Sequence, residues 1–169
     1  VSRPVSASFS SGSRSVSASQ PKWFIHKHEV ILQTRLGAGA YGEVFVGKWR
    51  RNNVAVKQLR RNCDEARHDF MHEMELLSEL RHPHIVRFMG ACLDESYMFI
   101  LFELCESSLY DLLHKSEKPL IQKQLLRILH DVALGVYYLH CEDPPLLHLD
   151  LKSANVLLDE MGIAKVCDF

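Results

Sequence analysis

A short polar cluster near the end of the chain constrains its fold and chemistry more than any other feature. Residues 147–155 read LHLDLKSAN, and Asp168-Phe169 begins thirteen positions after Asn155. The cluster gathers an acid, a cation and an amide within six positions, with a second acid beyond a short predicted strand pair. Phosphoryl transfer uses this set: a carboxylate to orient a hydroxyl, a cation for the moving phosphoryl group, and an amide with a carboxylate to hold Mg²⁺.

A structural alternative exists for the same stretch. Residues 147–152 alternate between apolar and polar side chains, as a half-buried β-strand does. Taken alone, the stretch does not decide between a strand and a catalytic loop. The order of the other segments along the chain has to decide.

The composition limits the class of protein. The chain has 169 residues, of which 47% are hydrophobic and 24% charged, with a formal net charge of -1, which fits one soluble domain or part of a larger one. No basic field indicates nucleic acid, and no apolar run approaches the roughly 20 residues of a membrane helix. The start lacks the layout of a secretory signal. We therefore expect a cytoplasmic protein with no membrane span and no nucleic-acid partner.

Cysteine and histidine give no sign of a disulfide framework or a metal centre. The five cysteines are odd in number, widely spaced and contain no Cys-x-x-Cys pair, so reduced thiols are expected. His68 and His72 lie one helical turn apart, but no acid or cysteine completes a ligand set around them.

The first 21 residues are predicted to form a disordered linker. They contain nine serines and little apolar surface, too little to offset the entropy of ordering. Serines near Arg3 and Arg14 could accept phosphate, although Ser-rich linkers without a regulatory role are common.

A glycine-rich segment, residues 37–42, follows a predicted strand that begins at residues 30–32. Its G-x-G-x-x-G spacing is weak evidence alone, and its best-known form opens a helix. Here residues 43–49 carry β-branched and aromatic side chains, so the glycines are predicted to cap a hairpin. Such a hairpin allows backbone N-H groups to approach phosphates, with an ordinary Gly-rich turn as the alternative.

A lysine and a glutamate are predicted to meet. Lys57 ends a predicted strand over residues 53–57, and a helix is predicted over residues 64–80. The apolar stripe of that helix consists of Phe70, Met74, Leu77 and Leu80. Glu73 lies on the same stripe, and a buried carboxylate requires a partner. Lys57 is the natural candidate.

Further strands are predicted at residues 85–92 and 97–104, joined by a turn at residues 94–96. Together with the earlier strands they would form a five-stranded antiparallel sheet with one helix packed on it, an α+β fold.

Helices follow this sheet. A short one is predicted at residues 109–113 and a long one at residues 120–140. The predicted apolar stripe of the long helix consists of Leu125, Leu129, Val132, Val136 and Leu139. A hairpin of residues 156–158 and 163–167 would then bring Asn155 and Asp168 side by side, where their oxygens, with those of a phosphate, suit Mg²⁺.

In this order the segments resemble the eukaryotic protein kinase domain, with its Gly-rich loop, strand lysine, helix glutamate, catalytic loop and Asp-Phe-Gly motif. The resemblance runs from about Trp23 to Phe169. It implies a bilobal fold over residues 22–169, with an N-lobe at about 22–102, a hinge at 103–107 and a partial, mostly helical C-lobe at 108–169. Five ordered motifs favour this fold over the isolated-strand alternative.

The resemblance implies that the chain binds ATP. The residues expected to cover its phosphates are Gly37, Ala38, Gly39, Ala40, Tyr41 and Gly42. The residues expected to enclose the adenine are Leu36, Val44, Ala55 and Leu157. The backbone of Glu103 and Cys105 would pair with the adenine edge, and Phe102 would narrow the pocket behind it.

The resemblance also assigns the chemistry. Lys57, steadied by Glu73, would hold the α- and β-phosphates, and Asp150 would accept the proton of the substrate hydroxyl. Lys152 would neutralise the γ-phosphoryl group. The expected Mg²⁺ ligands are Asn155 and Asp168. The side chains expected to stack as an internal spine are His148, Phe169, Leu77 and Phe88.

The residues within and around these motifs also resemble those of one kinase subgroup. Lys152, two positions after Asp150, looks like serine/threonine rather than tyrosine specificity. Residues 81–86 and 88–92 look like the tyrosine-kinase-like group that includes Raf and the mixed-lineage kinases. Two departures matter: Leu149 stands where most of these kinases have arginine, and the chain stops inside the Asp-Phe-Gly motif. We therefore expect this chain alone to transfer phosphate poorly or not at all.

The resulting hypothesis is an ATP- and Mg²⁺-dependent protein serine/threonine kinase that acts on a protein substrate. The alternative from another class is a pseudokinase, a module that binds a nucleotide or a partner without catalysis. A small-molecule kinase is disfavoured by the kept motif set.

Overall fold

The structure is a computed structural model that describes residues 20–39, 42–59, 64–94, 97–117 and 119–169, with the side chains of residues 64–69 excluded. Several sequence predictions therefore lie outside the described residues. They are the linker up to residue 19, residues 40 and 41 of the Gly-rich segment, residues 95 and 96 of the predicted turn, Cys63, and the side chain of His68.

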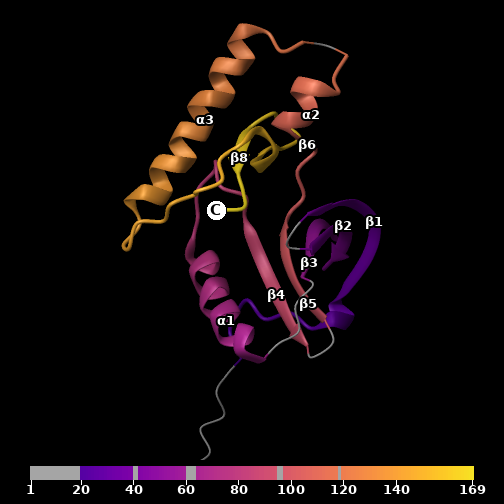
Figure 1. The fold of residues 1–169 in the computed structure, drawn as a ribbon. Helices are drawn as coiled ribbons and strands as arrows, with labels where there is room; N and C mark the ends of the chain where they lie inside the picture. Colours follow the sequence, from indigo (N-terminus) through magenta and orange to yellow (C-terminus); the bar gives the residue numbers. More distant parts are fainter. Residues whose placement is uncertain (1–19, 40–41, 60–63, 95–96, 118) are drawn as a thin grey trace, which may run out of the picture.

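One antiparallel sheet of five strands forms the larger layer, in the spatial order β1-β2-β3-β5-β4. Its strands are β1 (Val30–Gly39), β2 (Gly42–Trp49), β3 (Asn52–Leu59), β4 (Phe88–Asp94) and β5 (Tyr97–Glu103). The helix α1 (Asp64–Glu79) lies beside β4 (Figure 1). The predicted α+β arrangement of five antiparallel strands and one helix is confirmed.

The remaining elements form a second group, and the C-terminus lies between this group and the five-stranded sheet (Figure 1). They are a second antiparallel sheet, β6-β7-β8, with two helices and a 3-10 turn. Their bounds are β6 (Ser107–Ser108), α2 (Leu109–His114), α3 (Gln122–Cys141), η2 (Ser153–Asn155), β7 (Val156–Leu158) and β8 (Ala164–Val166); a further 3-10 turn, η1, spans Lys27–Glu29. The chain thus has the beginning of a helical second half, as expected.

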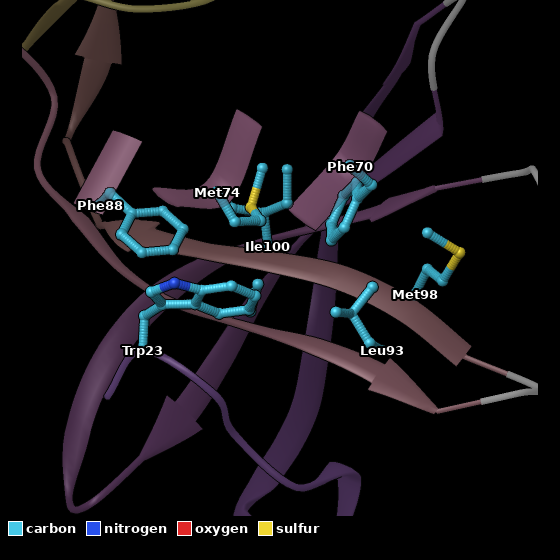
Figure 2. Close-up of a cluster of buried hydrophobic side chains, with 8 residues drawn as sticks. Trp23, Phe70, Met74, Phe88, Leu93, Met98 and Ile100 are labelled. Carbon is cyan, nitrogen blue, oxygen red and sulfur yellow. The ribbon is translucent and has the colours of Figure 1, made fainter. Parts of the chain in front are cut away.

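The predicted stripe of α1 is confirmed. Phe70, Met74 and Leu80 are buried and Leu77 is partly buried. Phe70 and Met74 join side chains of β4 and β5 in one cluster, and Trp23 closes it from the N-terminal segment (Figure 2). This cluster fixes α1 against the sheet and so determines the position of Glu73 on that helix.

The predicted stripe of α3 is partly wrong. Leu125 and Leu129 are exposed, whereas the buried residues of the helix are Ile128, Asp131, Gly135 and Leu139. A Cβ atom at Gly135 would lie 2.5 Å from the backbone oxygen of His84, so the glycine permits a close approach on that face. Asp131 is buried because its carboxylate accepts the Ala164 N-H at 3.2 Å.

The predicted strand 85–92 begins three residues too early, because β4 starts at Phe88. The backbone of residues 85 and 86 pairs with β8 instead: the Val86 N-H donates to Val166 O at 2.9 Å. The segment before β4 therefore joins the two sheets rather than extending the first one.

The glycine hairpin is confirmed for its described residues. β1 and β2 pair up to the position where Gly39 lies opposite Gly42. Gly42 has φ +151°, and a Cβ atom there would overlap the backbone oxygen of Gln58, so only glycine fits.

Candidate active site

The polar cluster forms a loop, not a strand. Residues 147–152, all of them described, have no strand conformation. The burial is the reverse of what the alternating pattern predicts, because Leu149 is 90% exposed and His148 only 7%. Leu149 has a positive φ of 56°, a conformation that a strand does not contain. The strand alternative is therefore wrong.

His148 supports this loop from beneath. Its carbonyl oxygen accepts the Asp150 N-H at 2.7 Å, and its ring packs edge-on against Phe169, with the ring centroids 6.2 Å apart. Leu77 packs against both the cluster that contains Phe88 and the cluster beside Phe169. His148 and Phe169 are thus in contact, and Leu77 lies against both clusters; the complete four-residue spine stays a prediction.

Asp150 is the centre of a hydrogen-bonded triad. Lys152 Nζ donates to Asp150 Oδ2 at 2.6 Å, and Asn155 Nδ2 donates to the same oxygen at 3.2 Å and to the Asp150 carbonyl at 2.9 Å. The hydrogen bond from Lys152 is the main reason that the pKa of the Asp150 carboxyl lies below its usual range. Asp150 is therefore an ionised carboxylate at neutral pH, with its side chain 60% exposed.

Asn155 and Asp168 come together as predicted. The β7-β8 hairpin brings Cys167 next to Asn155, whose carbonyl oxygen accepts the Cys167 N-H at 3.0 Å. Asp168 is the next residue, and both side chains line one cavity of about 670 Å³. Asp150, Lys152, Lys57 and Glu73 line it as well.

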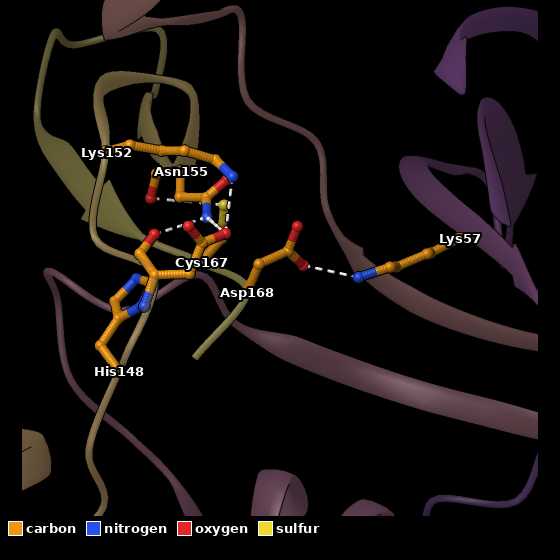
Figure 3. A network of polar contacts seen from close by, with 7 residues as sticks. Lys57, His148, Lys152, Asn155, Cys167 and Asp168 are labelled. Atoms are coloured by element: carbon orange, nitrogen blue, oxygen red, sulfur yellow. Dashed lines mark hydrogen bonds and ion pairs between the residues drawn. The ribbon is translucent and has the colours of Figure 1, made fainter. Parts of the chain in front are cut away.

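Lys57 is paired with Asp168 in this structure. Lys57 Nζ reaches from β3 to Asp168 Oδ1, 2.6 Å away (Figure 3). Asp168 approaches the ammonium group from the end of β8, with a backbone φ of 57°. The ion pairs of the described residues do not include the expected Lys57–Glu73 pair, which stays a prediction.

Glu73 nevertheless faces the same cavity as Lys57. Burial by the surrounding protein raises the pKa of the Glu73 carboxyl, and the positive charge of Lys57 opposes that shift. The residue is nevertheless exposed, so the prediction of a buried carboxylate on the apolar stripe is wrong, and solvent moderates both effects. Glu73 is thus close enough to Lys57 to feel its charge.

A second cavity, of about 370 Å³, adjoins the first and is lined by most of the residues expected to enclose a nucleotide. These are Leu36, Gly37, Val44, Ala55, Lys57, Glu103, Cys105 and Leu157. Phe102 lines both cavities and stands between them and the α1 cluster, as expected of a residue that narrows the pocket. Ala38, Gly39 and Gly42 lie in the hairpin but outside this lining.

The sequence reasoning missed two residues at this site. Cys167 lines both cavities, and burial raises the pKa of its thiol to about 12, so it is an uncharged wall of the site. Lys165 forms an ion pair with Glu103 beside the second cavity. Neither carries a motif signal, and only the pairing of β7 with β8 could have placed them.

The oxygen donors suit Mg²⁺. No three histidine, cysteine, aspartate or glutamate side chains gather as a metal site among the described residues. Asn155 uses its amide N-H₂ group on Asp150, which leaves its side-chain oxygen to face the cavity that Asp168 also lines. An amide oxygen and a carboxylate are hard donors, and Mg²⁺ at such sites takes its other ligands from phosphates and water. The residues present therefore fit the ion.

No helix among the described residues is both long and apolar enough to cross a membrane. The four described cysteines, Cys92, Cys105, Cys141 and Cys167, are free thiols, as expected for reduced cysteines.

Known proteins share this sequence over most of its length. The family model described as protein tyrosine and serine/threonine kinase matches residues 30–169. The chain is 41% identical over 145 residues to the probable serine/threonine-protein kinase drkA of Dictyostelium discoideum, which covers 84% of this chain and 23% of that protein. It is 41% identical over 146 residues to the serine/threonine-protein kinase CTR1 of Arabidopsis thaliana, covering 83% and 18%.

A mouse relative, the serine/threonine-protein kinase TNNI3K, is 40% identical over 150 residues, covering 86% of this chain and 17% of that protein. The chain thus spans about a fifth of the length of these relatives. The matched region contains the cavity residues described above and the order of motifs on which the resemblance rested. The chain belongs to the protein tyrosine and serine/threonine kinase family.

Proposed function

We propose that this chain provides the nucleotide-binding and phosphoryl-transfer site of an ATP- and Mg²⁺-dependent protein serine/threonine kinase. The observation that carries the proposal is the convergence of Lys57 and Asp168 with the Asp150 triad on one cavity, next to a second cavity whose walls suit an adenine. The names of the relatives support serine/threonine rather than tyrosine specificity. A cytoplasmic location stays a proposal.

Asp150 is the proposed acceptor of the substrate hydroxyl proton. The hydrogen bonds from Lys152 and Asn155 both reach its Oδ2, so they fix the carboxylate and leave Oδ1 for the hydroxyl. The same bonds keep the group ionised, as a proton acceptor must be. Lys152, whose side chain is 55% exposed, can place its positive charge beside the transferred group.

Lys57 and Asp168 have roles that require them to separate. In the proposed working state Lys57 holds the phosphates of ATP, while Asp168 and Asn155 hold Mg²⁺, which supplies neutralisation of the phosphate charge. Glu73 already feels the charge of Lys57 and lies at the same cavity, so it is the proposed new partner.

The proposed domain division follows the two sheets. Residues 22–102 would form the N-lobe, residues 103–107 the hinge and residues 108–169 the first part of the C-lobe. The Ser-rich linker, residues 1–21, remains a proposal as well. Leu149 is exposed and apolar, so it cannot pair with a phosphorylated activation segment as an arginine would.

One observation favours a binding module as the second candidate. Lys57 and Asp168 bond each other directly, so the cation and the carboxylate needed for catalysis are both engaged in the structure. A pseudokinase that binds nucleotide or a partner without transferring phosphate would be compatible with this pairing.

Transfer of radiolabelled phosphate from ATP to a protein substrate distinguishes the two candidates. The full-length natural protein should incorporate label, and Asp150→Asn should reduce the rate by roughly 10²- to 10⁴-fold, the range of a general base. Equal incorporation by both proteins, or none by either, would contradict the kinase proposal. Stabilisation by Mg²⁺-ATP in a thermal unfolding assay that is lost in Lys57→Met would support nucleotide binding separately.

A further inference from the structure

A partly buried ion pair connects the two sheets beside the second cavity. Glu103 ends β5, and Lys165 is the middle residue of β8. Lys165 Nζ lies 3.0 Å from each carboxylate oxygen of Glu103, and the two side chains are only 13% and 17% exposed. This is a well-formed, charge-assisted contact, unlike a surface ion pair.

The Glu103 carboxylate also fixes a third segment. Its Oε1 accepts the Arg87 N-H at 2.7 Å, and the Glu103 N-H donates to Arg87 O at 3.0 Å. Just before Arg87, the backbone of His84 accepts the Val166 N-H at 2.9 Å. Three chain segments, residues 84–87, Glu103 and β8, therefore converge on one carboxylate.

The other end of the proposed hinge is tied to the same hairpin. The Glu106 N-H donates to Leu158 O on β7 at 2.9 Å, and the next two residues pair with β7 as β6. One anchor thus holds the hinge to β8 and the other holds it to β7. Between the anchors only Leu104 and Cys105 remain, and both line the second cavity.

The ion pair lies beside the wall that Leu157 forms. Lys165 is the cross-strand neighbour of Leu157, so the two side chains share one face of the hairpin. Leu157 lines the second cavity, and Lys165 lines a different cavity of about 310 Å³ that Glu103 lines as well. Lys165 is not among the residues that line the second cavity, whereas its partner Glu103 is. The ion pair is therefore placed to set the distance between Leu157 and the hinge backbone.

The geometry points to Glu103 and Lys165 as positioning residues that clamp the hinge over the β7-β8 hairpin and thereby set the affinity of the site for its nucleotide. This inference rests on the proposed function, since it assumes that the second cavity takes the adenine of ATP. A buried ion pair contributes uncertain net stability compared with apolar residues, so a geometric role accounts for it better than stability does.

A double-mutant cycle on the full-length natural protein tests the inference. Glu103→Gln removes the charge but keeps an acceptor for Arg87, and Lys165→Met removes the cation at similar length. Each variant should raise the KM for Mg²⁺-ATP roughly five- to tenfold, within the range of coupled contacts, with little change in kcat. The double variant should resemble each single variant instead of showing the product of both effects.

Two further variants separate positioning from general damage. Lys165→Arg keeps a cation and should restore most of the ATP affinity. Lys115→Met removes the lysine of the exposed Asp111–Lys115 pair, whose atoms lie 2.7 Å apart and line neither of the two site cavities, and should leave the KM unchanged. If Lys165→Met fails to fold, the double variant carries the test, because it leaves no buried charge without a partner.

The outcomes distinguish the inference from the proposed function. If the wild-type protein neither binds nor uses ATP, the proposed function fails and the inference fails with it. If the wild-type protein uses ATP and the folded double variant has the same KM, or if the single effects multiply, the clamp alone is refuted.

Discussion

Two ion pairs join the five-stranded sheet to the last residues of the chain, and they differ in burial. Lys57–Asp168 lies inside the larger cavity, at 2.6 Å, with side chains 21% and 47% exposed. Glu103–Lys165 lies beside the second cavity, at 3.0 Å, with side chains 17% and 13% exposed. Water and ligands can compete for the first pair more readily than for the second, whose side chains are less exposed. The open pair is thus suited to exchange partners during a reaction, and the buried pair is suited to hold its geometry.

The largest expected effect is on turnover and belongs to the open pair. Asp168→Asn should lower kcat of the full-length natural protein by roughly 10²-fold or more, because several kcal/mol of transition-state charge stabilisation would depend on the carboxylate proposed to hold Mg²⁺. Lys165→Met should leave kcat close to its wild-type value. Asp143→Asn, an exposed acid outside both cavities, is the matched control. Similar losses of kcat in Asp168→Asn and Lys165→Met would remove the distinction between the two pairs.

The next effect is on nucleotide binding. Lys57→Met should weaken binding of Mg²⁺-ATP roughly 10- to 100-fold, since a hydrogen bond to a charged group contributes about 1.5–3 kcal/mol. Calorimetric titration of the full-length protein measures this change. Lys48→Met, at an exposed lysine on the neighbouring strand β2, should bind as the wild type does. Unchanged affinity in Lys57→Met would show that the lysine remains with Asp168 when nucleotide binds.

A smaller effect is expected on the rate at which the Cys105 thiol is alkylated. Two variants should change this rate in opposite directions. Burial, with a smaller contribution from the charge of Glu103, raises the pKa of this thiol to about 11, and the charge of Lys165 opposes the rise. Alkylation of Cys105 should therefore be slow near neutral pH and accelerate as the pH approaches 11, because the thiolate is the nucleophile.

At a fixed pH, Glu103→Gln should lower the pKa of Cys105 and speed its alkylation, and Lys165→Met should do the reverse. Mass spectrometry of the labelled peptide measures both rates, with the exposed thiol of Cys141 as an internal reference. Acceleration in both variants would indicate general loosening of the hinge instead of an electrostatic effect.

The smallest effect is expected at an exposed pair on α2. Asp111 and Lys115 bond at 2.7 Å, and the hydrogen bond from Lys115 is the main cause that lowers the pKa of Asp111 to about 2. Because both side chains are exposed, Lys115→Met should leave the melting temperature almost unchanged, whereas Lys165→Met should lower it clearly. Equal shifts in thermal unfolding would mean that burial does not separate the two kinds of pair.

The sequence predicted one helix better than the other, for a physical reason. α1 packs against the sheet with one apolar stripe, so periodicity identified Phe70, Met74, Leu77 and Leu80 as its inner face. α3 has apolar residues on more than one side, and its inner face includes Asp131 and Gly135. Hydrophobic periodicity cannot identify this face, because Asp131 is buried by a hydrogen bond to the backbone and Gly135 by the close approach of another backbone segment.

The candidate site divides in the same way. The motif spacing placed Asp150, Asn155 and Asp168 on one cavity, because the hairpin between them leaves little freedom. It could not decide which carboxylate Lys57 meets, since Glu73 and Asp168 both lie within reach of one long side chain. Lys165 was invisible because a single lysine in a three-residue strand carries no pattern.

The two anchors of the hinge have a consequence for how the molecule moves. Because Glu103 is held to β8 and Glu106 to β7, the proposed hinge between the two halves can flex, but both of its ends stay attached to the β7-β8 hairpin. The two halves would then open and close at the end of the site away from the hinge, where Lys57 and Asp168 face each other. Nucleotide would enter and leave past that contact. The exchange of partners at Lys57 would therefore control the rates of nucleotide binding and release.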